Sequence, residues 1–312
     1  MLFMKNAFLF LIFALSAIGS QAQNLYSKSF GEKQNPALIY LHGGPGYNCS
    51  NFEVSTANTL AKAGFYVIVY DRRGEGRSED AAAAYTFEQT LQDLNALYEQ
   101  YHLEKATLLG HSFGGMVGIK YAAQFPKRVK NLVLIGAPIS LQESFKTILA
   151  TVKPIYLAKE DKTNLNYIAM LENMDSSSLQ YSSYCFMHAM QNGFYSPANS
   201  NPKATELYAL FKTDSILKNY GAKMGYAAPQ GFWKNEQYTT LDMTAELQKT
   251  LKQGTAVYGL YGKEDGLYSE KQVLDLQALL GAENLLYLEN CSHNVYIDRQ
   301  VAFIQFIEKV ER

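Results

Sequence analysis

Ser112 is the residue whose type and surroundings most clearly indicate chemistry. It lies in the pattern G-x-S-x-G at 110–114, with an apolar run before it and a helical pattern after it. A serine at such a strand-to-helix turn projects its hydroxyl above the sheet as a nucleophile. The glycines keep the tight turn free of side chains, and the following helix directs its amide dipoles at a developing oxyanion. The motif therefore predicts acyl transfer by Ser112.

A second glycine-rich turn, H-G-G-P-G at 42–46, directly follows the apolar run Ala37–Leu41. Acyl transfer needs a backbone donor opposite the amide that follows the nucleophile. Glycine suits this task because it lets the backbone approach a substrate closely. We expect the amides of Phe113 and Gly44 to form the oxyanion hole, with Gly43 as the alternative to Gly44.

Asp265 is the expected acid of a catalytic triad. In sheets that carry this serine turn, the chain order is nucleophile, acid, histidine. Asp265 follows the apolar run 255–260 in the stretch Y-G-K-E-D-G, with Glu264 as the alternative acid. Such a carboxylate orients the imidazole and stabilises the imidazolium that forms during the reaction.

His293 is the expected general base. It follows the apolar run Leu285–Leu288 and precedes the last helical pattern, and the only other histidine after Ser112 is His188. We predict that His293 takes the proton from Ser112 during the attack on a carbonyl carbon. This mechanism requires no metal or organic cofactor, and no Cys/His spacing resembles a metal site.

The elements that must position these residues alternate along the chain. Short apolar runs predict buried strands, and longer stretches with apolar residues three and four apart predict helices that pack on them. This alternation with short connections predicts an α/β protein with a doubly wound, mostly parallel sheet. The expected strands are Ala37–Leu41, Tyr66–Tyr70, 106–109, 132–135, 255–260 and Leu285–Leu288; the expected helices are 86–102, Phe113–Gln124, Glu270–Leu280 and 299–310. Thr86 is the expected N-cap of the first helix.

The alternation is interrupted once, over a long and mostly helical stretch. We expect the core at 23–138 and 250–312, and a helical cap at 139–249 above the carboxyl ends of the strands. Before the first expected strand, only 25–30 offers a further strand, so the sheet edge should be short. The loop D-R-R-G-E-G-R-S at 71–78 indicates structure, with Asp71 and Arg73 expected to pair.

The first 22 residues read as a secretory signal peptide. Lys5 precedes a short apolar run that ends in small residues, with cleavage expected after Ala22. The run is well short of the roughly 20 residues that span a bilayer. We therefore expect an exported protein, periplasmic or secreted, without stable membrane insertion once the signal is removed.

Composition excludes several other classes. The net charge is −1 and 47% of residues are apolar, which predicts a full core and no affinity for nucleic acid. The odd number of cysteines leaves at least one unpaired within the chain, and a disulfide between Cys49 and Cys291 is an open alternative.

These motifs together resemble the proline iminopeptidase branch of the α/β-hydrolases. The resemblance rests on H-G-G-P-G, then D-x-R-G-x-G-x-S, then G-x-S-x-G-G, and on the spacing of glycine, two residues and Asp265. It implies an α/β-hydrolase fold and a serine exopeptidase, or a related esterase or amidase. Ser292 departs from the family, which carries glycine immediately before the histidine.

The substrate is expected to be a small molecule or a short peptide. The cap is rich in aromatic residues, most of which should be core, with a few lining an apolar pocket. An exopeptidase needs a carboxylate for the free α-ammonium, and the candidates are Glu172, Glu206 and Glu236. Trp233 precedes Glu236 in a loose match to the family's tryptophan and glutamate. The alternatives are a small-molecule carboxylesterase or amidase, and a non-catalytic ligand-binding relative.

Overall fold

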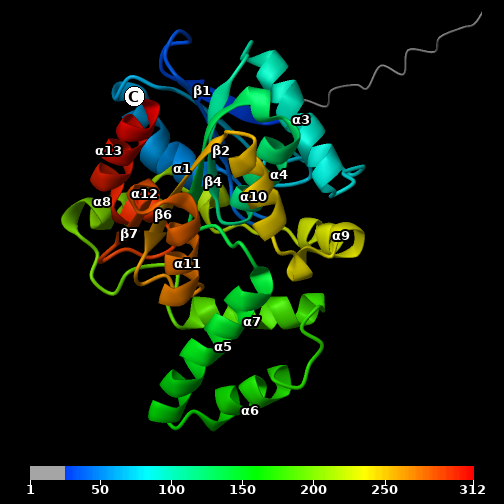
Figure 1. Ribbon diagram of the computed structural model, residues 1–312. Coiled ribbons are helices and arrows are strands. Elements are labelled where there is room, and N and C mark those ends of the chain that lie inside the picture. Colours follow the sequence, from blue (N-terminus) through cyan, green and yellow to red (C-terminus); the bar gives the residue numbers. More distant parts are fainter. Residues whose placement is uncertain (1–24) are drawn as a thin grey trace, which may run out of the picture.

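The computed structural model describes residues 25–312, and the expected signal peptide lies outside this range. Within it, seven strands form one sheet in the order β1-β3-β2-β4-β5-β6-β7 (Figure 1). All neighbouring pairs are parallel except β1 and β3. The strands are β1 Ser27–Phe30, β2 Ala37–Leu41, β3 Tyr66–Tyr70, β4 Ala106–His111, β5 Val129–Ile135, β6 Ala256–Gly262 and β7 Leu285–Leu288. The expected fold class is confirmed.

The central strands are buried on both faces, which is why they read as continuous apolar runs. In β3 and β4 every residue is buried. The edge strand β1 differs, because Lys28 and Ser29 are exposed. It pairs antiparallel with β3, from Ser27 opposite Tyr70 to Phe30 opposite Val67, so the sheet edge consists of the single short strand that the sequence predicts.

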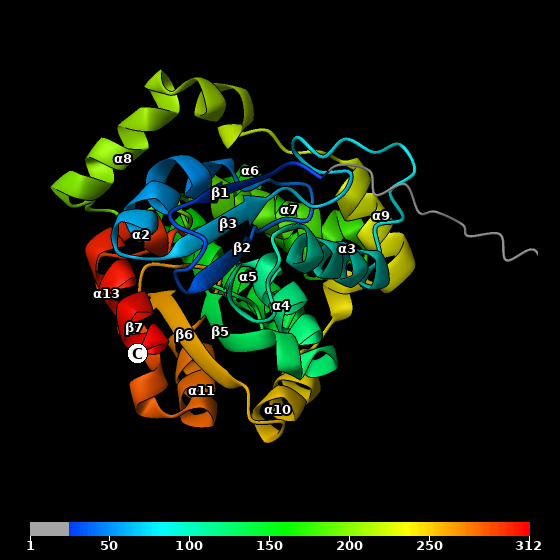
Figure 2. The same ribbon diagram turned by 90° about the horizontal axis from the view of Figure 1, so that it is seen from above.

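Helices cover both faces of the sheet (Figure 2). One apolar core lies under α3 Phe87–Gln100, α4 Phe113–Gln124, α10 Thr244–Lys252 and α11 Glu270–Leu280. The other core lies under α1 Ser50–Phe52, α2 Asn58–Lys62, α12 Val295–Asp298 and α13 Gln300–Glu311. Short helical turns complete the connections: η1 Glu53–Ala57, η2 Pro126–Arg128, η3 Leu217–Gly221, η4 Tyr238–Thr240 and η5 Ala282–Asn284.

Local sequence sets the start of α3 as expected. Thr86 has an extended backbone and its side-chain oxygen accepts a hydrogen bond from Gln89 N at 3.2 Å. That bond satisfies one of the amides that a helix N-terminus leaves without an intrahelical partner. The single helix predicted at 299–310 is instead preceded by a separate turn, α12, because the chain changes direction at Arg299.

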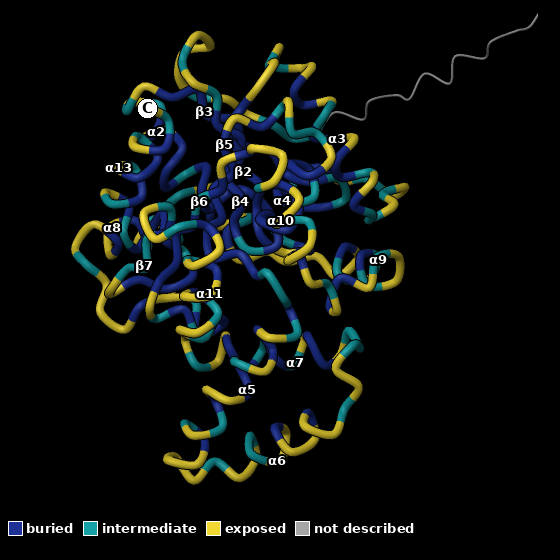
Figure 3. Tube along the Cα trace, viewed as in Figure 1, coloured by how far each residue is buried: buried dark blue, intermediate teal, exposed yellow. Residues whose placement is uncertain are grey.

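The long segment between β5 and β6 contains the helices α5 Leu141–Ala158, α6 Lys162–Leu171, α7 Leu179–Gln191, α8 Pro202–Thr213 and α9 Ala227–Glu236, and then α10. Figure 1 shows α5, α6 and α7 stacked beyond the sheet, and Figure 3 shows much of α6 exposed. The helix α10 packs against α4 of the core.

The loop after β3 departs from the predicted pairing. Asp71 pairs with Arg77 at 2.7 Å, whereas Arg73 pairs with Asp80 at 3.0 Å and with Asp93 of α3 at 2.5 Å. The expected Asp71–Arg73 pair is therefore wrong. Gly76, at φ +56°, turns the chain back so closely that a Cβ there would clash with the Asp71 carboxylate. This turn brings the Arg77 side chain onto Asp71.

The three cysteines, Cys49, Cys185 and Cys291, are free and buried in the described part of the chain. The alternative of a Cys49–Cys291 disulfide is thus not realised. In residues 25–312, no helix is long and apolar enough to cross a bilayer.

Candidate active site

The turn between β4 and α4 holds Ser112 in a strained conformation. Its φ of 52° and ψ of −125° lie outside the regions that non-glycine residues ordinarily adopt. Neighbouring backbone maintains the strain: Ser112 N donates to Ile135 O at 3.0 Å, and a Cβ at Gly110 would lie 2.7 Å from Gly115 Cα. A Cβ at Gly114 would clash with the Leu41 carbonyl. Strain of this kind is characteristic of functional sites, and here it exposes the serine at the start of a helix.

His293 and Asp265 lie together in the loops after β7 and β6. His293 Nδ1 and Asp265 Oδ2 are 2.8 Å apart, and both side chains are almost fully buried. The other carboxylate oxygen, Oδ1, accepts a hydrogen bond from Leu267 N at 3.1 Å. Gly136, at the end of β5, closes against the pair, since a Cβ there would lie 3.2 Å from His293 Nδ1. A carboxylate held in this way can orient an imidazole.

The histidine loop is joined directly to the serine turn. His111, the neighbour of Ser112, has its Nε2 3.2 Å from His293 O, and the two rings are 4.8 Å apart. Burial lowers the pKa of His111 well below its usual range, with a smaller contribution from His293. Among the described hydrogen bonds, His293 is joined to Asp265 and His111, and none of them joins its imidazole to Ser112 Oγ.

The glycine loop after β2 is fixed from beneath by Arg72. The guanidinium donates to the carbonyl oxygens of His42 and Gly43, the latter at 2.6 Å. In a trans peptide the C=O and N–H groups point in opposite directions. The amide of Gly44 belongs to the same peptide as the Gly43 carbonyl and therefore points away from Arg72. A Cβ at Gly43 would lie 3.2 Å from Ser112 Cβ, so a side chain there would crowd the serine turn.

A buried ion pair supports the same loop. Arg72 Nε is 2.9 Å from Glu75 Oε1, and Glu75 Oε2 accepts the amide of Gly46 at 2.7 Å. Burial raises the pKa of Glu75 despite the neighbouring guanidinium. His42 accepts the Arg72 amide at Nε2 and lies 2.8 Å from Gly43 O at Nδ1. These partners require a neutral ring protonated at Nδ1, and burial accordingly lowers the pKa of His42 well below its usual range.

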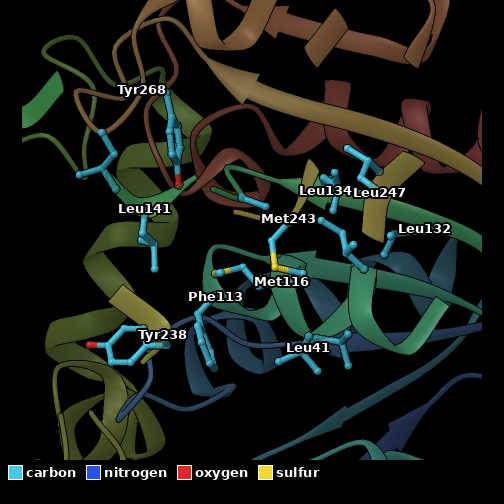
Figure 4. Packing of buried hydrophobic residues seen from close by; sticks show 14 of the residues in the cluster. Leu41, Phe113, Met116, Leu132, Leu134, Leu141, Tyr238, Met243, Leu247 and Tyr268 are labelled. Carbon is cyan, nitrogen blue, oxygen red and sulfur yellow. The ribbon is translucent and has the colours of Figure 1, made fainter. Parts of the chain in front are cut away.

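A small pocket lies over the serine turn. Figure 4 shows side chains of its lining: Leu141, Tyr238 and Tyr268 lie around Phe113 and Met116 of α4. The lining residues are Gly44, Ser112, Phe113, Met116, Pro138, Leu141, Ser144, Phe186, Tyr238, Leu267 and Tyr268. Gly44 and Phe113 thus line the same pocket as Ser112, whereas Gly43 does not. The lining contains no charged side chain, so the pocket suits a neutral apolar group.

The predicted substrate-binding residues of the cap make other contacts. Trp233 Nε1 donates to Ser177 O at 2.8 Å, and Glu236 Oε1 accepts the amide of Phe87 at 2.7 Å. Glu172 forms an exposed ion pair with Lys153 at 2.5 Å. Glu206 likewise forms an exposed ion pair, with Lys203. None of these side chains lines the pocket over Ser112.

Sequence analysis did not identify Arg72 and Glu75 as the ion pair that supports the glycine loop. They lie three residues apart in a loop that was expected to be structural, and that spacing could have suggested the pair. Ser292 has a negative φ, as a non-glycine residue before the histidine requires. Its hydroxyl donates to Phe194 O at 2.7 Å, a cap contact that only the folded chain reveals.

Comparison with known proteins agrees with this architecture. Residues 36–300 match the family model of the alpha/beta hydrolase fold. A proline iminopeptidase from Lactobacillus delbrueckii subsp. lactis is 33% identical over 168 residues, which are 52% of this chain and 56% of that enzyme. A proline iminopeptidase from Lactobacillus helveticus is 24% identical over 298 residues, which are 91% of this chain and 92% of that enzyme.

A solved structure shows the same fold. The proline iminopeptidase-related protein from Thermus thermophilus aligns with a TM-score of 0.65 and 21% identity, over 92% of each chain. The chain therefore belongs to the α/β-hydrolase fold family. The relatives that it resembles within that family are proline iminopeptidases.

Proposed function

We propose that the chain is a serine hydrolase that works through an acyl-enzyme, with Ser112, His293 and Asp265 as its catalytic triad. The observation that carries the proposal is the buried His293–Asp265 pair, 2.8 Å apart, in which the loop of His293 contacts the strained serine turn. The chain order of serine, aspartate and histidine is that of the fold family.

Each group then has a definite role. His293 accepts the Ser112 proton as Oγ attacks the substrate carbonyl, and it returns that proton to the leaving group when the acyl bond breaks. The amides of Gly44 and Phe113 stabilise the oxyanion, an effect worth about 3 kcal/mol for each donor. Water, deprotonated by His293, then attacks the acyl-enzyme and releases the acid product. Asp265 keeps the imidazole in the required tautomer throughout.

A fluorophosphonate probe tests this mechanism without knowledge of the substrate. The probe should label the wild-type protein at Ser112, and Ser112→Ala should abolish the labelling. Asp265→Asn should slow the reaction by about 10³–10⁴-fold, because an uncharged amide favours the wrong tautomer of His293. A wild-type protein that resists labelling would support the non-catalytic ligand-binding alternative.

The substrate class has two candidates. Relatives that are proline iminopeptidases support an aminopeptidase that removes N-terminal proline. The apolar pocket favours a carboxylesterase or amidase instead, because its lining offers no carboxylate to a substrate ammonium. Glu172, Glu206 and Glu236 are engaged elsewhere by Lys153, Lys203 and Phe87 N.

Parallel assays of proline-naphthylamide and short-chain nitrophenyl esters distinguish the two candidates. Because the pocket lining carries no charged side chain, we expect ester turnover to exceed the release of proline. Efficient cleavage of the prolyl amide would establish the aminopeptidase and would require an acidic group to approach the pocket.

We also propose that the protein is exported, which the signal-peptide pattern in the first 22 residues supports. Expression of the full chain followed by N-terminal sequencing tests this. The mature protein should begin at Gln23, and an intact N-terminus on protein confined to the cytoplasm would contradict the proposal.

A further inference from the structure

The segment 194–201 connects α7 of the cap with α8 and crosses the two loops that carry Asp265 and His293 (Figure 1). We call this segment the strap. It begins where Phe194 N bonds to Ala189 O at the end of α7, and it ends at Asn201, whose side chain caps α8. The strap has no role in the mechanism above.

The strap contacts the acid loop at two points. Ala198 N donates to Glu264 Oε2 at 2.7 Å, and Glu264 is the neighbour of Asp265. On the other side of Asp265, the ring of Phe194 lies so close to Gly266 that any Cβ there would clash with it. The strap therefore holds the acid loop on both sides of the carboxylate.

The same strap bonds to both neighbours of His293. Ser292 Oγ donates to Phe194 O at 2.7 Å, and Asn294 Nδ2 donates to Tyr195 O at 3.1 Å. Ser292 is fully buried, so losing its hydroxyl would leave a carbonyl without a partner.

The Tyr195 ring lies against the imidazole itself. Its centroid is 5.1 Å from that of His293, with the two planes at 86°. An edge-to-face contact of this kind restricts tilting of the imidazole and covers it from solvent.

A last connection fixes the far end of the strap. Asn201 Nδ2 donates to Asp298 O at 2.5 Å, and Tyr208 of α8 donates to Asp298 Oδ1 at 2.7 Å. Asp298 Oδ2 in turn accepts the amide of Ser292 at 2.8 Å. The histidine loop is thus held between the strap and Asp298.

We propose that the strap is a positioning element for the Asp265–His293 pair, and that it acts through its own Tyr195 and through Ser292, to which it is hydrogen-bonded. The acid and the base lie on separate loops, and the strap is bonded to both. It therefore maintains the orientation in which the imidazole can reach Ser112. Misplacement of a catalytic group by about 1 Å can cost on the order of 100-fold in rate. The inference rests on the proposed function, because it assigns the strap to the same reaction.

Substitutions on the strap and its partner test the proposal. Tyr195→Ala should lower the maximal rate of fluorophosphonate labelling about tenfold, with the apparent affinity for the probe unchanged. Tyr195→Phe retains the ring and should label at close to the wild-type rate. Ser292→Ala removes one hydrogen bond and should slow labelling about fivefold.

Two matched variants in the cap serve as controls. Tyr167→Ala removes an exposed tyrosine from α6, and Ser183→Ala removes an exposed hydroxyl that bonds a helix carbonyl. Both should label at the wild-type rate. Thermal unfolding of every variant shows whether the protein remains folded at the assay temperature.

The outcomes separate the two proposals. If the wild-type protein is not labelled, or Ser112→Ala still is, the proposed function fails. If the wild type is labelled at Ser112 and folded Tyr195→Ala and Ser292→Ala react as fast as it does, the strap proposal alone is overturned. An equal loss of rate in Tyr167→Ala would also overturn it, because the effect would then be general to the cap.

Discussion

Arg72 occupies a buried position beneath the glycine loop, where its guanidinium has four oxygen partners. Two are carbonyls of His42 and Gly43, and two belong to the carboxylate of Glu75. Arginine suits such a site because its planar group presents donors in a fixed arrangement. The chemistry of the loop amides thus depends on a residue that does not line the pocket.

Arg72→Ala should destabilise the protein by about 3–5 kcal/mol, because it leaves Glu75 as an unpaired charge in the interior. The loss should be smaller at pH 5 than at pH 8. Burial already raises the pKa of Glu75, so without Arg72 the carboxyl can be protonated at the lower pH. Chemical denaturation at the two pH values measures both effects.

Lys146→Ala is the matched control for Arg72→Ala. Lys146 and Glu143 also form an ion pair three residues apart, at 2.7 Å, but both side chains are more than half exposed. Breaking an exposed pair should cost less than about 1 kcal/mol. If the two variants lose equal amounts of unfolding free energy, burial of the Arg72–Glu75 pair does not increase its contribution to stability.

At the scale of elements, α11 follows the acid loop and has a complete capping box. The amide of Ser269 donates to Gln272 Oε1 at 2.8 Å, and Ser269 Oγ accepts the amide of Gln272 at 3.3 Å. Its buried residues, Val273, Leu276 and Leu280, recur three and four apart and face the sheet. Capping therefore sets where the helix begins, and the apolar face sets how it packs.

Ser269→Ala should lower the free energy of unfolding by about 1 kcal/mol, because the N-terminal amides of α11 lose a hydrogen-bond acceptor. Ser269→Asp should retain most of the stability, since aspartate also accepts at this position. Denaturation with urea provides the measurement. An alanine variant as stable as the wild type would show that solvent satisfies these amides equally well.

At the scale of the whole molecule, Asp298 joins distant parts of the chain. Its carboxylate accepts bonds from Tyr208 of α8 and from the amide of Ser292. Burial is the main reason that its pKa is raised from an ordinary 3.8 to about 6. In the window from about pH 4 to 6, the folded protein therefore keeps a proton that the unfolded chain has already released.

The stability contributed by protonated Asp298 should be present below about pH 4 and lost as the pH rises to about 6. Asp298→Asn cannot titrate, so its stability relative to the wild type should increase across that window. The relative change should be at most about 3 kcal/mol. Unfolding free energies of both proteins from pH 4 to 7 provide the measurement. If stability changes with pH in the same way in both proteins, titration of Asp298 is not the cause.

Much of the fold and the central site follows from short stretches of sequence. The strands Ala37–Leu41 and Tyr66–Tyr70 are recognisable because burial on both faces requires continuous apolar residues. The serine turn is recognisable because close backbone contacts exclude side chains at Gly110 and Gly114. Asp265 and His293 were predicted from chain order, and the structure brings them to 2.8 Å.

Tertiary packing decided what the local pattern left open. Arg77, rather than Arg73, reaches Asp71 because the chain folds back at Gly76. The glutamates of the cap could be proposed as ligands of a substrate ammonium only because of their residue type. Glu236 bonds Phe87 N, a residue 149 positions away, and no local pattern encodes such a partner.

The sequence by itself determined the alternating elements and the three candidate catalytic residues, because periodicity, turn chemistry and chain order act over short distances or follow one topology. Only the tertiary structure decided the lining of the pocket, the buried Arg72–Glu75 pair and the strap across His293. These depend on how the cap helices pack against loops far away in the chain. That packing depends on the combined shapes of many side chains and on which polar groups still need a hydrogen-bond partner.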